Sequence, residues 1–160
     1  MTYKDLIDVF KGVADDLCPT ALTFLYDNVW AMNGAPSITY PCVLVEAHPN
    51  FDFQGVQANT NKVGLQKFSG KLFFFDTYWN DEKAAKETYQ KQSELNELSL
   101  KIIAEIKTRL LALDKPVEIN FGSGFFGTNV HNAKLVEVFI PYNVTVRVGC
   151  DVADFTSCHV

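Results

Sequence analysis

Residues 135–148 read Leu-Val-Glu-Val-Phe-Ile-Pro-Tyr-Asn-Val-Thr-Val-Arg-Val. Every even position from Val136 to Val148 is apolar, whereas the odd positions are mixed and include Glu137 and Arg147. A period of two sustained over this length is typical of a β-strand with one buried face. The segment therefore predicts a long strand and a fold organised around a sheet.

Pro141 lies inside this strand. Proline has no N–H group to donate, so within sheets it is found on edge strands or at bulges. We therefore expect the long strand to be an edge strand, or to pair outward over only half its length. A long apolar edge aggregates unless another chain covers it. This predicts an oligomer in which each subunit's edge faces its neighbour.

Helical periodicity marks two further segments. Residues 3–16 carry apolar side chains at helical spacing and predict an amphipathic helix that lies on the core. Residues 80–113 predict a long helix, which Asn80 can cap. Its first half, Lys83–Gln92, is almost wholly polar, so we expect that half to project or to meet a partner.

Strand character recurs along the rest of the chain and predicts an α+β fold. The N-terminal helix and the one long helix are expected to pack on one face of an antiparallel or mixed sheet of about five strands. Residues 49–62 predict a long exposed loop or a protruding hairpin, and the Gly-rich residues 122–133 predict a flexible connecting loop. We expect a single domain over 1–149 and a C-terminal tail over 150–160. The expected strands cover 21–32, 38–47, 63–78, 117–121 and 134–148.

Composition limits the classes of partner. The 160 residues are 48% hydrophobic and include 13 Phe, so part of the apolar surface is expected to be hidden by a partner. The net charge of −5 argues against a protein that retains nucleic acid, because duplex binding depends on neutralising phosphates with Lys and Arg. The first residues carry charges, so we expect no secretion signal. No apolar stretch is long enough for a membrane span, so we expect none.

No group of residues predicts a reaction. The segment Gly122–Gly127 is rich in glycine, but a phosphate loop needs a following helix, and here a strand is expected to follow. Cys150, Cys158 and His159 could form part of a metal site. We favour the alternative, in which they are incidental residues of a C-terminal tail. Cys42 lies mid-strand and is favoured as a small core residue over a nucleophile. We therefore expect no catalytic residues, no metal and no cofactor.

Seven residues are candidates for contacts with another subunit or a partner protein. Most lie in segments with too few apolar residues to belong to the domain's own core, and loops on a rigid scaffold are common contact sites. The two Phe of the Gly-rich loop are either core plugs or exposed contacts. The candidates are Phe51, Phe53, Lys83, Lys86, Tyr89, Phe125 and Phe126.

The order of elements resembles that of the tail terminator and related neck or head–tail completion proteins of tailed bacteriophages. The resemblance rests on the opening helix Tyr3–Asp16, the strand Tyr40–Val45, the strand Lys71–Thr77 that feeds the helix 80–113, and the closing strand 134–148. It covers nearly the whole chain. It implies a small α+β domain that has no catalytic residues and assembles into a homomeric ring.

The resemblance also implies a virion structural protein at the head–tail junction of a tailed phage. Its partners would be further copies of itself, the tail tube and the neck or portal-adaptor proteins. DNA would pass through an acidic lumen without specific binding, and the ring would be assembled in the host bacterial cytoplasm. The alternative is a small-molecule-binding or enzymatic α+β domain that uses the 122–133 loop as a lid. The oligomeric state separates these two hypotheses.

Overall fold

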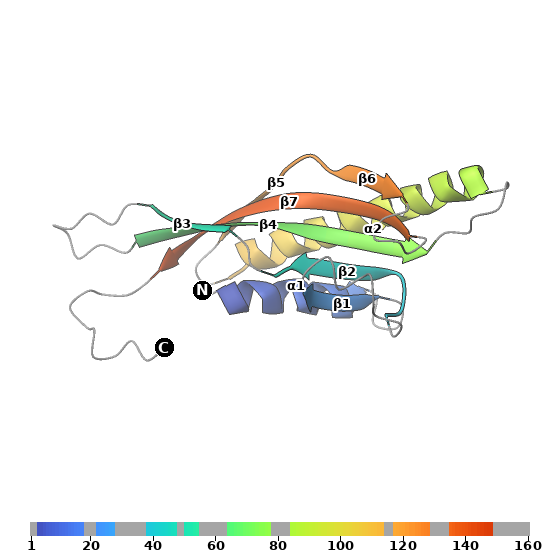
Figure 1. The fold of residues 1–160 in the computed structure, drawn as a ribbon. Helices are drawn as coiled ribbons and strands as arrows, with labels where there is room; N and C mark the ends of the chain where they lie inside the picture. The colour runs from blue at the N-terminus through green and yellow to red at the C-terminus, as the bar shows by residue number, and fades with distance from the viewer. Residues whose placement is uncertain are drawn as a thin grey trace.

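The structure is a computed structural model, which describes residues 3–17, 22–27, 38–47, 50–54, 64–77, 84–113, 117–128 and 135–148. These residues form two α-helices and seven β-strands (Figure 1). In chain order they are α1 Tyr3–Leu17, β1 Thr23–Asp27, β2 Cys42–Glu46, β3 Asn50–Gln54, β4 Gly64–Thr77, α2 Ala84–Leu111, β5 Glu118–Phe121, β6 Phe125–Thr128 and β7 Leu135–Val148. The fold is α+β, as the sequence predicts.

Two strands of 14 residues form the centre of the sheet. β4 and β7 pair antiparallel along their whole length, from Gly64 opposite Val148 to Thr77 opposite Leu135. The other side of β4 carries β2 and β3, and the other side of β7 carries β5 and β6. β1 pairs parallel to β2, so the sheet is mixed. β7 is therefore an interior strand, and the prediction that it is an edge strand is wrong.

The break between β5 and β6 accommodates Pro141. The three residues 122–124 span the length that two residues span on β7, which makes a β-bulge. The amide of Gly122 donates a hydrogen bond of 2.8 Å to the carbonyl of Pro141. The carbonyl and the nitrogen of a strand residue point to the same side, so the missing donor of Pro141 faces the bulge. A bulge in the neighbouring strand, and not an edge position, is what tolerates the proline.

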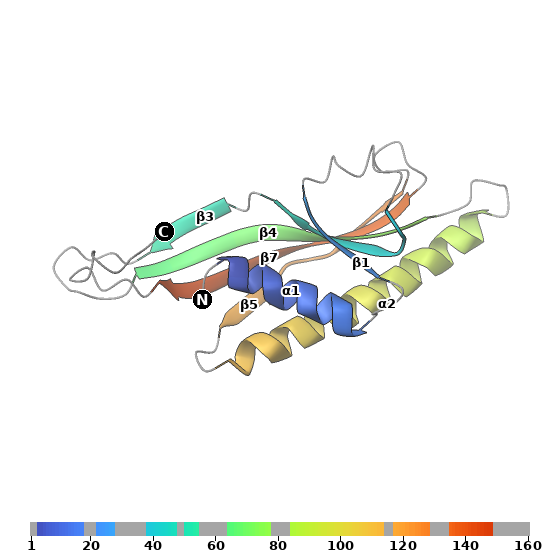
Figure 2. The ribbon, with the colours of Figure 1, turned by 90° about the horizontal axis from the view of Figure 1, so that it is seen from below.

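Both helices cover the same face of the sheet, as predicted (Figure 2). The even positions of β7 turn toward them, which confirms the alternation seen in the sequence. Leu6 and Phe10 of α1 and Ile102 and Ile106 of α2 are buried against these side chains. The buried even positions of β7 are Val136, Val138, Ile140, Tyr142, Val144 and Val146.

The other face of β7 is also buried over its first half. Leu135 and Glu137 are nearly inaccessible, and Leu135 belongs to a second, smaller apolar cluster on the face without helices. The expectation of one buried face therefore holds only for the second half of the strand, where Thr145 is exposed. Glu137 is a polar residue at an odd position of β7, yet its side chain is buried and does not face solvent.

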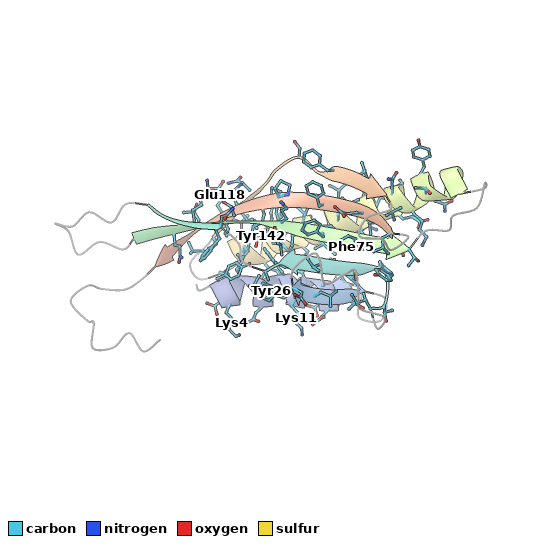
Figure 3. All side chains as sticks on the ribbon, viewed as in Figure 1. Lys4, Lys11, Tyr26, Phe75, Glu118 and Tyr142 are labelled. Atoms are coloured by element: carbon cyan, nitrogen blue, oxygen red, sulfur yellow. The ribbon has the colours of Figure 1, made fainter. Side chains whose placement is uncertain are left out.

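Tyr142 ties the sheet to α1 at its centre (labelled in Figure 3). Its ring packs edge-on against Phe10, with ring centroids 5.4 Å apart, and its hydroxyl lies 3.3 Å from the hydroxyl of Tyr3. Gly70 is its partner across β4, where an added Cβ would lie 2.6 Å from the Tyr142 hydroxyl oxygen. Gly70 therefore leaves the space that the tyrosine ring needs to cross the neighbouring strand.

Two segments predicted as loops contain strands. Residues 50–54 form β3, which pairs antiparallel with β4, so the hairpin alternative is correct for this part of 49–62. β3, the start of β4 and the end of β7 extend together beyond α1 (Figure 1). Residues 125–128 form β6, so the prediction of a loop over 122–133 is wrong for these residues. Residues 55–63, 129–134 and the predicted tail 150–160 lie outside the described residues.

The first half of α2 makes little contact with the core. Among the side chains of α2 that are described, which begin at Thr88, Leu95 is the first that is buried. An ion pair of 2.7 Å between Lys91 and Asp76 connects this half to the end of β4. Figure 2 shows α2 continuing past the end of β4. These observations agree with the expectation that the polar half projects.

Candidate assembly surface

A row of Phe side chains crosses the sheet on the face without helices. Phe125 of β6 stacks on Phe139 of β7 with ring centroids 4.8 Å apart, and Phe139 lies 5.7 Å from Phe73 of β4. Phe73 stacks in turn on Phe75 at 5.9 Å (Phe75 is labelled in Figure 3). Phe73 and Phe75 are buried, whereas Phe125 is 52% exposed. The row thus runs from the interior of the domain to the sheet edge at β6.

β6 is an apolar edge. In the part of the chain that the structure describes, β6 pairs only with β7. Phe126 is 59% exposed, and the whole segment from Gly122 to Thr128 contains no ionisable residue. Edges of soluble sheets are normally protected by charge, by proline or by a covering segment. β6 is short and follows a bulge, which limits pairing, but its residues supply neither charge nor proline, so this edge can be covered by another chain.

On the C-terminal side of Pro141 along β7, the face without helices becomes polar. The Ser69 hydroxyl donates to the Asn143 side-chain oxygen over 2.6 Å, and the Lys71 amine lies 4.0 Å from the Glu46 carboxylate. A shallow depression of about 410 Å³ lies over these residues. They can hydrogen-bond to a polar surface, but the lining holds no pair of a nucleophile and a base within hydrogen-bond reach.

Two buried groups on this face have raised pKa values. Burial raises the pKa of the Glu137 carboxyl, and the positive charge of Lys71 partly opposes that shift. Burial also raises the pKa of the Cys42 thiol to about 12, with a smaller contribution from Asp76. A thiol with this pKa stays protonated near neutral pH and is a poor nucleophile. Cys42 is therefore a core residue, as the sequence predicts.

The structure places the predicted contact residues at two ends of the molecule. Phe51 and Phe53 lie in β3. In Figure 1 this strand is at one end of the molecule, and the first turns of α2 are at the other. Tyr89 is 74% exposed on the projecting half of α2. Phe125 and Phe126 lie together on β6 and are exposed, which decides against their being core plugs.

The predicted residues therefore do not form one surface. Lys86 lies in α2, and Lys83 lies outside the described residues, as do His48, His131 and His159 and the cysteines other than Cys42. Among the described residues only the two Phe of β6 are adjacent, and their side chains lie on opposite faces of the sheet, with Phe125 on the face without helices. Phe139 completes that site and was missed, because its odd position in the long strand suggested a solvent-facing side. Its aromatic character in an otherwise mixed set was the available signal.

In the described ranges, no three His, Cys, Asp or Glu side chains gather as a metal site requires. None of the helices in those ranges combines the length and the apolar character that a membrane crossing needs. Comparison with models of protein families and with curated protein sequences found no match.

Proposed function

We propose that this protein is a structural component of a tailed-phage virion, tail terminator-like or part of the neck, which assembles as a homomeric ring at the head–tail junction. The observation that carries the assembly is the edge of β6, which no other described strand pairs with, and its exposed Phe125 and Phe126. The resemblance in element order supports the phage setting. An apolar edge of this kind is stable in solution when neighbouring chains cover it.

The partners follow from the same proposal. The ring contacts the tail tube on one side and neck or portal-adaptor proteins on the other, and the extended end around β3 and the projecting half of α2 are the surfaces offered for these contacts. The net charge of −5 favours a lumen that DNA crosses without being held. The ring is assembled in the host bacterial cytoplasm and ends in the virion.

The role proposed here is not enzymatic. The alternative, a binding or catalytic domain with residues 122–133 as a lid, requires that segment to move over a pocket. Residues 125–128 are instead paired with β7, and Phe125 is stacked on Phe139. These contacts hold a third of the supposed lid to the sheet, so the geometry supports the assembly function better.

Sizing with light scattering and negative-stain imaging across a concentration series tests the proposal. We expect closed rings of one size at high concentration or on tail-tube protein. The double variant Phe125→Ser/Phe126→Ser should shift the protein to monomers. Leu111→Ser is the matched control, because Leu111 is 60% exposed on α2 and lies outside the edge, and this variant should still form rings.

Two results would count against the proposal. A wild-type protein that stays monomeric at every concentration and with tail-tube protein would remove the ring. Turnover of a small-molecule substrate would favour the enzymatic alternative. In a separate measurement, the protein should not retain duplex DNA at physiological salt.

A further inference from the structure

The sheet has two uncovered margins at the same end. There its strand order is β1-β2-β4-β7-β6, and among the described residues β1 pairs only with β2, as β6 pairs only with β7. The registers place apolar residues in rows that run from one margin to the other. One row, on the face without helices, is Leu25, Leu44, Phe73, Phe139 and Phe125; the next, on the helix face, is Phe24, Val43, Phe74, Val138 and Phe126.

The outward backbone groups of β1 can be identified. The amide of Thr23 donates to the carbonyl of Pro41, and the amide of Ala47 donates to the carbonyl of Asp27. Residues 23, 25 and 27 therefore direct their peptide groups toward β2. Successive residues of a strand alternate in this direction. The peptide groups of Phe24 and Tyr26 thus point out of the sheet.

The same reasoning applies to β6. The hydrogen bond from Gly122 to the carbonyl of Pro141 shows that odd residues of β7 direct their peptide groups toward β5 and β6. Phe139 is one of them, and its partner Phe125 directs its peptide group inward. The peptide group of Phe126 therefore points outward. On both margins, the outward backbone belongs to residues whose side chains lie on the helix face.

We propose that β6 of one copy pairs with β1 of the next copy, so that the sheets of neighbouring subunits join head to tail. This inference rests on the proposed homomeric assembly. Along the strand order, β1 and β6 run in opposite directions, so copies in the same orientation bring them together antiparallel. Phe126 then lies opposite Phe24 or Tyr26, which keeps the helix face of one sheet continuous with that of the next.

Charge does not oppose this pairing. Asp27 is the single ionisable acid or base of β1 apart from the phenol of Tyr26, and it meets no like charge because Gly122–Thr128 has none. The alternative in which two copies pair β6 with β6 covers that margin but leaves β1 uncovered, with Tyr26 47% exposed. A head-to-tail contact covers both margins in every subunit, and such a contact repeats into a closed ring when its rotation closes.

Each contact is weak when it stands alone. A fully buried aromatic side chain hides about 150–250 Å². Covering the exposed parts of Phe125, Phe126 and Tyr26 therefore adds roughly 300 Å² per contact, below the ~1,200–2,000 Å² of a stable interface. Ring closure gives every subunit two such contacts. Assembly through this edge should accordingly depend on protein concentration.

Disulfide trapping tests which edges meet. In a background with Cys18, Cys150 and Cys158 replaced by Ser, the buried Cys42 remains as the single native thiol. Leu25→Cys combined with Phe125→Cys places two thiols opposite each other when Phe126 faces Phe24. Asp27→Cys combined with Phe125→Cys does so when Phe126 faces Tyr26, so one of these two double variants should respond. Oxidation of that variant should give a ladder of covalent oligomers that ends at the ring number. Each single variant should give no ladder and no covalent dimer.

Blocking one outward N–H group gives a second test. Tyr26→Pro and Phe126→Pro each remove a donor that faces the neighbouring copy and leave the bonds within the subunit. Tyr26→Ala and Phe126→Ala are the controls, because they remove the aromatic side chain and keep the backbone N–H group. We expect each Pro variant, shown to be folded by circular dichroism, to need at least tenfold more protein for assembly than its Ala control.

The outcomes separate this inference from the proposed function. Rings that form in both Pro variants as readily as in their Ala controls, or a covalent dimer from Phe125→Cys alone, would overturn the β6–β1 pairing and leave homomeric assembly standing. A wild-type chain that never assembles would overturn both.

Discussion

The ring of Pro141 occupies the space that a side chain on Gly122 would need: a Cβ atom there would lie 2.8 Å from the Pro141 Cγ atom. Gly122 is therefore the residue that lets the bulge between β5 and β6 close on the proline. The pyrrolidine ring is fixed to the backbone of β7 and cannot rotate away.

Gly122→Ala should lower the free energy of unfolding by about 1–3 kcal/mol, because the added methyl group forces the bulge away from β7. Urea denaturation followed by circular dichroism measures the change. Gly12→Ala is the control, since Gly12 lies inside α1 and its added Cβ would make an ordinary contact of 3.5 Å with the Arg109 side chain. That variant should stabilise the protein by about 0.5–1 kcal/mol. Two changes of the same sign would contradict this description of the bulge.

The two faces of β7 should respond differently to a carboxylate. Val144 is buried under the helices, and Thr145, one residue on, is exposed on the other face. Val144→Asp should lower the free energy of unfolding by more than about 3 kcal/mol, enough to unfold much of a domain of ordinary stability. Thr145→Asp should change it by less than about 0.5 kcal/mol. Thermal melts of the two variants provide the comparison, and equal melting temperatures would show that the register is wrong.

Glu137 predicts a dependence of stability on pH. Burial raises the pKa of its carboxyl in the folded state above the value in the unfolded chain. Its protonation therefore stabilises the fold fully below the unfolded pKa, and this contribution is lost as the pH rises through the folded pKa. Glu137→Gln keeps the shape and removes the titration. The melting temperature of the wild type, relative to this variant, should fall as the pH is raised from 4 to 8. Parallel curves over that range would contradict it.

Cys42 should be protected from thiol reagents. Its side chain is fully buried, and its pKa is raised to about 12. In the background that lacks the other three cysteines, iodoacetamide at pH 8 should leave the folded protein unmodified and should label it completely in 6 M urea. Mass spectrometry reads the labelling. Rapid labelling of the folded protein would show that β2 is more open than the structure indicates.

The sequence predicted the side-chain direction of β7 correctly and its neighbours incorrectly. Alternation is a local property, so Val138 and Val144 could be assigned to the helix face from their spacing alone. The position of a strand in a sheet depends on pairing with distant residues, as between Leu135 and Thr77. Pro141 was consistent with an edge or a bulge, and only the course of residues 122–124 decides between them.

β3 was predicted only as one of two alternatives and β6 was missed, for a related reason. β3 and β6 have five and four residues; Asn50–Gln54 alternates polar and apolar residues but lies within a polar, amide-rich segment, and Phe125–Thr128 shows no alternation. Their extended conformation comes from pairing with β4 and β7, which local patterns do not encode. The candidate surface was half predicted: the exposure of Phe125 and Phe126 was one of two open alternatives. Its completion by Phe139 depends on the register of β6 against β7.

The 14 paired residues of β4 and β7 also determine how the protein responds to force. β4 continues toward α2 from Thr77, and β7 ends at Val148, at the opposite end of the same ladder. Tension applied between these two points pulls the strands past each other and loads their hydrogen bonds in parallel. A pull on β6 detaches a four-residue strand from its end. The central pair therefore resists shear strongly, while the margins peel under a much smaller load.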